Sequence, residues 1–166
     1  MGITAHLKEY ICGTMANKRF TNDVHIKNNK ARYEFELMDD FIAGIQLAGT
    51  EIKSIRESKA NINEAFVSLL GQEVYVRNMF VAEYTEGTYD NHTPKRDRKL
   101  LLNKTEIKKI RKHMLIKGFT AVPTLLFVNE KGLAKLKFSL AKGKKLHDKR
   151  ESLKQKDLKR QIDREA

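Results

Sequence analysis

Apolar and polar residues alternate along much of the chain with a period of two, which is typical of β-strands that bury one face. Near the end of the pattern, for example, Leu136 and Phe138 point to one side while Lys135 and Lys137 point to the other. Turn residues separate these stretches, such as the Gly-Gln pair at 71–72. The predicted strands cover residues 32–37, 41–47, 66–70, 73–77, 79–84, 120–128 and 133–140.

Two features interrupt the first two predicted strands. Asp39 and Asp40 predict a turn between them, because aspartate is favoured in turns. Gly44 lies inside the second strand and predicts a bulge or a sharp coil there. A small closed barrel needs such residues at its corners. Residues 85–98 contain glycine, asparagine and proline, and are expected to form a surface loop.

Two segments have helical spacing instead. Isoleucines three residues apart in 50–56 predict a short helix, for which Thr50 can act as the cap. A longer helix is predicted to begin at Asn103, where Glu106 completes a capping box, and to end at Gly118. Short strands with interrupting helices predict a mainly β fold, namely a small antiparallel OB-like β-barrel with two or three short helices. A mixed α+β sandwich is the alternative.

The length of 166 residues suits one domain with appendages. Residues 1–22 have no sustained period and are expected to form a poorly ordered N-terminal extension, in which Met15 is a second plausible start. The OB-like barrel is expected to span residues 23–141, and residues 142–166 to form a basic tail.

Charge is concentrated in this tail. The whole chain has a formal net charge of +12, and residues 142–166 contain ten basic and five acidic side chains. On a helix at about 100° per residue, Leu146 and Leu153 would lie together, but Leu158 and Ile162 would lie roughly 120–160° away. Such a helix has no apolar face for docking on the barrel. The tail is therefore predicted to be disordered in isolation and to bind a polyanion.

Several function classes find no support in the sequence. No run approaches the roughly 18 apolar residues of a membrane span, and the N-terminus lacks the apolar block of a signal peptide. The single Cys12 suits the reducing cytoplasm. The five histidines have no metal-ligand spacing, and there is no Gly-rich phosphate loop, Ser elbow or Cys–His pair. A cytoplasmic protein without catalytic residues, cofactor or metal is expected.

Several short sequence motifs, each different from the others, follow one another from about residue 17 to the end of the chain. Residues 49–56 read Gly-Thr-Glu-Ile-Lys-Ser-Ile-Arg, and residues 142–150 read Lys-Gly-Lys-Lys-Leu-His-Asp-Lys-Arg. Together with the other motifs, they resemble the signature of the small protein B family, the SsrA-binding proteins that bind transfer-messenger RNA. The segments that carry the resemblance are 29–32, 43–56, 59–62, 96–103, 118–123 and 141–150.

The resemblance implies a monomeric adaptor whose barrel binds the tRNA-like part of transfer-messenger RNA. It also implies that the tail enters the vacant decoding site and the empty message path of a stalled ribosome, and that elongation factor Tu acts indirectly, through the RNA. No membrane partner is implied. A structural ribosomal protein or a general RNA-binding protein is the alternative function. A nucleic-acid-processing enzyme is a further rival, which would need a metal or base cluster.

The resemblance also implies which barrel residues bind RNA. Amides at a helix N-terminus favour anions, and basic side chains neutralise phosphates. From composition alone the same residues would be read as a helix cap and a solvated basic face. Asn103 fits a cap well, and Leu101 could be core. The expected RNA-binding residues are Lys30, Arg32, Gly49, Thr50, Glu51, Lys53, Ser54, Arg56, Arg96, Arg98, Lys99, Leu101 and Asn103.

In the tail, basic residues can neutralise ribosomal RNA phosphates, and the ring of His147 can stack on an exposed base. A lone exposed histidine often has no role, but its place inside the basic motif favours stacking. The expected ribosome-binding residues are Lys142, Lys144, Lys145, His147, Asp148, Lys149 and Arg150. The chain departs from the family pattern at Tyr33, where histidine is common, and at Ile42, where glutamate is usual.

Overall fold

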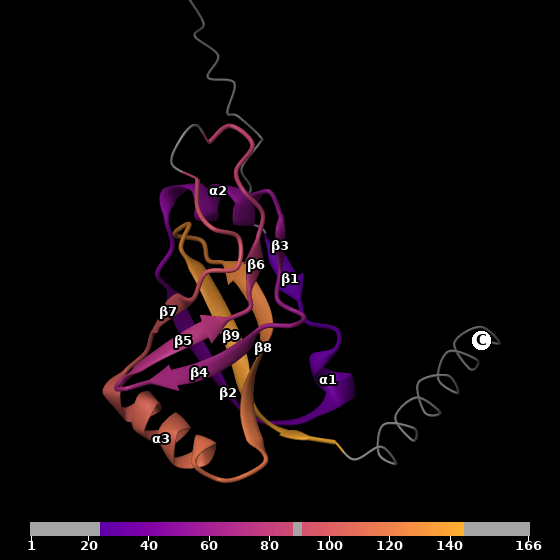
Figure 1. The fold of residues 1–166 in the computed structure, drawn as a ribbon, viewed down its shortest axis with the longest axis vertical. Coiled ribbons are helices and arrows are strands. Elements are labelled where there is room, and N and C mark those ends of the chain that lie inside the picture. The colour runs from indigo at the N-terminus through magenta and orange to yellow at the C-terminus, as the bar shows by residue number, and fades with distance from the viewer. Residues whose placement is uncertain (1–23, 88–90, 145–166) are drawn as a thin grey trace, which may run out of the picture.

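The computed structural model describes residues 24–87 and 91–144 (Figure 1). The predicted N-terminal extension and nearly all of the tail lie outside these ranges. The larger sheet contains β1 (His25–Lys27), β2 (Phe35–Ile45), β4 (Phe66–Leu70), β5 (Glu73–Arg77), β7 (Arg98–Leu101), β8 (Phe119–Val128) and β9 (Ala134–Gly143). A small sheet pairs β3 (Ala60–Asn61) with β6 (Phe80–Val81), and the helices are α1 (Ala31–Glu34), α2 (Gly49–Arg56) and α3 (Lys104–Met114).

Neighbouring strands of the larger sheet pair antiparallel in the order β1-β8-β4-β5-β7-β2-β9, and β8 also pairs with β9. This last pairing closes six of the strands into a ring. β1 is added on the edge of β8 that also meets β4. The prediction of a mainly β, antiparallel fold with two or three short helices is confirmed, since the described residues form three helices. The closed ring agrees with an OB-like barrel.

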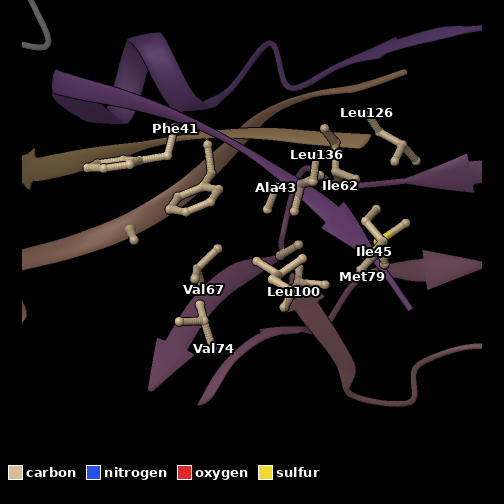
Figure 2. Close-up of a cluster of buried hydrophobic side chains, with 14 of the residues drawn as sticks. Phe41, Ala43, Ile45, Ile62, Val67, Val74, Met79, Leu100, Leu126 and Leu136 are labelled. Atoms are coloured by element: carbon tan, nitrogen blue, oxygen red, sulfur yellow. The ribbon is translucent and has the colours of Figure 1, made fainter. Parts of the chain in front are cut away.

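Apolar side chains from every strand of the ring fill its interior (Figure 2). The rings of Phe41 and Phe138 stack with their centroids 5.6 Å apart. Leu136, Phe138 and Leu140 are all at most 1% exposed, which confirms the predicted inward face of β9. Because burial of a large apolar side chain contributes roughly 1.5–3 kcal/mol, this core stabilises the barrel that carries the surface groups.

Both predicted hairpins form. β4 and β5 have the predicted bounds, and Gly71 at their turn has a φ of +62°, which favours glycine. β8 and β9 are joined by a turn in which Asn129 Oδ1 accepts a hydrogen bond from the Leu133 amide at 2.8 Å. β9 continues to Gly143, so Lys142 belongs to the barrel and not to the tail.

Two predictions near the start of the barrel are wrong. Residues 32–34 alternate like a strand, but they lie in α1, because Asn28 Oδ1 accepts hydrogen bonds from the amides of Lys30 and Ala31 and begins a helical turn. The predicted turn at Asp39 and Asp40 is instead a bulge within the continuous strand β2, where the register with β9 shifts.

Helices α2 and α3 form where the sequence predicts helices, with different details. Ala48, not Thr50, is the N-cap of α2, and its amide donates to Glu51 Oε2 at 2.7 Å. α3 begins after Asn103, whose amide donates to Glu106 as expected, but it ends at Met114. The predicted strand 79–84 shortens to β6, and the end of the predicted loop pairs with β5 as β7.

Candidate nucleic-acid interface

Helix α2 covers one end of the barrel and is fixed there by a buried carboxylate (Figure 1). Glu51 has no exposed surface, although it lies in the first turn of the helix. Its Oε1 accepts hydrogen bonds from Arg96 Nε at 2.7 Å and from Arg98 Nε at 2.9 Å. One carboxylate therefore joins α2 to the chain segment that leads into β7.

Arg98 is the second buried charge of this cluster. Its guanidinium also donates to the carbonyls of Met79 at 2.6 Å, Arg96 at 3.0 Å and Pro94 at 3.1 Å. Burial lowers the pKa of Arg98, although Glu51 acts in the opposite direction. Burial would raise the pKa of Glu51, but hydrogen bonds from Arg96 and the Ala48 amide, with the charge of Arg98, hold it below its ordinary value.

These burials correct three of the predicted RNA contacts. Glu51, Ser54 and Arg98 have 0% exposed surface, so their side chains cannot touch RNA in this conformation. The buried pair of Glu51 and Arg98 instead connects α2 to the start of β7, below the protein surface.

Other residues of the motif do reach the surface at α2. Gly49 and Lys53 are exposed, and Thr50 is half-buried. A Cβ built on Gly49 would meet no atom within 4 Å, so the space in front of it is open. Lys53 Nζ lies 5.1 Å from the centroid of the Tyr84 ring. The side chain of Arg96 is 35% exposed and is oriented by Glu51.

The loop beside α2 contains functional candidates that sequence reasoning missed. His92 is buried and lies 2.9 Å from the Thr50 hydroxyl. Asn91 exchanges hydrogen bonds with the backbone of Tyr84, at 3.2 Å to its amide and 2.9 Å to its carbonyl. The loop was predicted only as a surface segment. The asparagine, histidine and proline in this loop are the sequence features that could have indicated a structured, hydrogen-bonded segment.

A second region is a broad groove of about 910 Å³ between α3 and the strands β7 and β2. Leu101 is 57% exposed and Ile42 is 53% exposed in this groove. Asn103 lines it where α3 begins. The charged side chains along it are five cations and two anions: Lys99, Lys104, Lys108, Arg111, Lys135, Glu73 and Glu106. The groove therefore offers apolar contact within a cationic wall.

Lys99 is held within that groove by its neighbours. Its ammonium pairs with Glu73, which also accepts a hydrogen bond from the Tyr75 hydroxyl at 2.7 Å. The hydrogen bond from Lys99, helped by that from Tyr75, keeps the pKa of Glu73 below its usual value. Leu101 packs over Gly44, whose added Cβ would lie 3.5 Å from Leu101 Cβ.

The remaining predicted residues lie elsewhere on the barrel. Lys30 and Arg32 are exposed at α1, where the Arg32 carbonyl accepts from Lys144 Nζ at 3.0 Å. The backbone amide of Lys144 donates to the Glu34 carbonyl at 3.0 Å, so β9 leaves the barrel along α1. Tyr33 on α1 is 39% exposed.

Arg56, at the end of α2, donates to the Gly132 carbonyl at 3.1 Å. The structure thus separates the predicted barrel residues into three regions, at α2, at the α3 groove and at α1 (Figure 1). The predicted tail residues Lys145, His147, Asp148, Lys149 and Arg150 lie outside the described residues.

The described segments, residues 24–87 and 91–144, contain neither a candidate membrane-spanning helix nor a cluster of metal-binding side chains. No helix within them has the length and apolar composition needed to cross a membrane. Among the same residues, no group of three or more histidine, cysteine, aspartate or glutamate side chains could hold a metal ion.

Comparison with known proteins shows the family to which the chain belongs. The family model described as SmpB protein matches residues 25–166. The chain belongs to the SmpB family. It is 57% identical over 141 residues to the SsrA-binding protein of Bacteroides thetaiotaomicron, covering 85% of this chain and 94% of that protein. It is 50% identical over 155 residues to the SsrA-binding protein of Christiangramia forsetii, covering 93% and 96%.

A solved SmpB structure has a similar fold. It is described as "tmRNA-SmpB: a journey to the center of the bacterial ribosome" and matches with a TM-score of 0.63 and 39% sequence identity. The match covers 74% of this chain and 85% of that chain. The family resemblance inferred from the motifs is therefore confirmed.

Proposed function

We propose that this protein is an RNA-binding adaptor for ribosome rescue. It binds the tRNA-like domain of transfer-messenger RNA and delivers it to stalled ribosomes, where trans-translation tags the nascent peptide. The observation that carries this proposal is family membership along nearly the whole chain, with SsrA-binding proteins as relatives. The SmpB family consists of RNA-binding proteins, not enzymes, so the adaptor acts without a catalytic residue.

The barrel surfaces at α2 and α3 support RNA binding. At α2, exposed Gly49 and Lys53 lie beside Arg96, which can offer its planar face and one N–H because Glu51, Gln46 and Asp97 occupy the others. At the α3 groove, exposed Leu101 and Ile42 suit contact with a ribose or base, and the surrounding lysines suit phosphates. RNA-binding proteins combine these two kinds of contact.

The tail supplies the contact with the ribosome in this proposal. Lys145, Lys149 and Arg150 neutralise phosphates of the decoding site and message path, and His147 stacks on an exposed base. Asp148 lies within the same motif. Lys142 and Lys144 instead lie in the folded part of the chain, just before the tail. Lys142 pairs with β2 as part of β9, and Lys144 donates a hydrogen bond to the Arg32 carbonyl in α1. The protein acts as a monomer in the cytoplasm, and elongation factor Tu joins it only through the RNA.

A reconstituted translation reaction tests this function. Ribosomes are stalled on a message without a stop codon, and charged transfer-messenger RNA and elongation factor Tu are supplied with or without the purified protein. Peptide tagging should depend on the protein. Unchanged tagging in its absence, or no tagging in its presence, would contradict the proposal. Purified ribosomes that are not stalled should carry little of it, whereas a structural ribosomal protein would be present at one copy per ribosome.

A further inference from the structure

The ring of buried His92 has a hydrogen-bond partner at each nitrogen. Nε2 lies 3.3 Å from the carbonyl oxygen of Val81, and Nδ1 lies 2.9 Å from the hydroxyl oxygen of Thr50. A carbonyl oxygen can only accept a hydrogen bond, so Nε2 must carry a proton. In the neutral imidazole, Nδ1 then carries no proton, and its lone pair can only accept a hydrogen bond.

The tautomer of His92 determines the direction in which the Thr50 hydroxyl donates its hydrogen bond. While the ring is neutral, Nδ1 accepts, and the Thr50 hydroxyl then donates its single hydrogen inward to His92. A hydroxyl has one donor hydrogen and two acceptor lone pairs. What remains for a bound molecule at Thr50 is acceptor capacity alone. An RNA phosphate, which has no proton to donate at neutral pH, is therefore a poor partner for this oxygen.

Thr50 lies at the start of α2, next to an open space. It is the second residue of α2 and is half-buried, and it follows the exposed Gly49 with its open space. Lys53 lies three residues later, which places it on the same helix face. A ribose next to Thr50 would thus have its phosphate within reach of the Lys53 ammonium or the first amides of the helix.

We propose that the Thr50 oxygen accepts a hydrogen bond from a ribose 2′-hydroxyl of the bound RNA, and that His92 is the positioning residue that imposes this polarity. The 2′-hydroxyl is the group that distinguishes RNA from DNA and can donate a hydrogen bond. The inference rests on the proposed function, since it specifies one contact within RNA recognition. Under this proposal, α2 recognises the ribose of the RNA in addition to its phosphate charge.

The test combines protein variants with single-atom changes in the RNA. The tRNA-like domain of transfer-messenger RNA is assembled with a 2′-deoxy or 2′-fluoro nucleotide at one position at a time, and dissociation constants are measured by gel shift. A neutral hydrogen bond predicts that Thr50→Val weakens binding roughly two- to tenfold, whereas Thr50→Ser retains it. At one ribose, 2′-deoxy and 2′-fluoro should each weaken wild-type binding by the same factor, but leave Thr50→Val binding unchanged.

A His92→Phe variant gives the positioning readout. Without Nδ1 the Thr50 hydroxyl can rotate, so the penalty for 2′-fluoro relative to 2′-hydroxyl should shrink at that ribose. Circular dichroism checks that this variant folds, and the ribose scan with wild-type protein remains decisive if it does not. Binding by Thr50→Val equal to wild type, or no ribose coupled to Thr50, would overturn the inference while RNA binding stands. Failure of the wild-type protein to bind the RNA would instead overturn the proposed function, and the inference with it.

Discussion

Replacing Glu51 by glutamine should destabilise the barrel, because the change leaves a buried positive charge without its partner. Glu51 and Arg98 both have 0% exposed surface. Removing one partner of a buried ion pair costs about 3–5 kcal/mol. We expect a loss near 3 kcal/mol, since Arg98 keeps its hydrogen bonds to three backbone carbonyls and Arg96 is partly exposed. This is a large part of a net stability of roughly 5–15 kcal/mol.

The free energy of unfolding can be measured by urea titration with far-ultraviolet circular dichroism. Asp97→Asn is the matched control, because Asp97 pairs with Arg77 on the surface, where both side chains are about half exposed. Exposed pairs contribute roughly 0–1 kcal/mol, so this control should stay close to the wild type. Loss of the same amount in both variants would mean that the effect is not due to burial.

The pH dependence gives an independent check of the same charge. The folded pKa of Glu51 lies below its ordinary value of 4.5, so the carboxylate stabilises the fold above that pH. The stabilisation is lost as the pH falls through the lower folded pKa. The difference between wild type and Glu51→Gln should therefore narrow in acid. A difference below about 1 kcal/mol at neutral pH, or one that does not depend on pH, would refute the reasoning.

Further variants test the groove and the base of the tail. Leu101→Ala should weaken binding of the tRNA-like domain several-fold in filter assays without changing the urea midpoint, because the side chain is 57% exposed; unchanged binding would place the RNA elsewhere. Lys108→Gln should reduce the slope of log affinity against log salt by about 0.7–0.9, whereas Lys117→Gln, outside the groove lining, should not. Lys144→Pro removes the amide that bonds to Glu34, so limited proteolysis near residue 144 should accelerate; an unchanged rate would argue against this anchor.

The strands and helices with long, regular patterns could be predicted from sequence. The β4–β5 hairpin was found because alternation and a Gly-containing turn agree there. The pattern over residues 32–34 misled, because the tertiary position of Asn28, bonded to Ile62 and Pro123 carbonyls, fixes a helical turn instead. β1 and β3, of three and two residues, are too short to show a period.

The candidate site was predictable as a set of motif residues, but not by the role of each. Glu51 and Arg98 lie 47 positions apart, and only the closed fold shows that they form a buried pair. The link between Thr50 and His92 spans 42 positions and carries no local signal. Leu101, by contrast, was open to either a core or a surface role, and the structure places it on the surface.

A chain ending at Lys144 tests most directly whether the barrel and the tail have separate roles. The cut lies beyond β9 and keeps the contacts of Lys144 with α1. Gel shift with the tRNA-like domain and peptide tagging on stalled ribosomes are measured on the same preparation. The expected result is RNA affinity close to that of the full chain with tagging abolished. Loss of RNA binding, or tagging at the full-chain level, would contradict this division of roles.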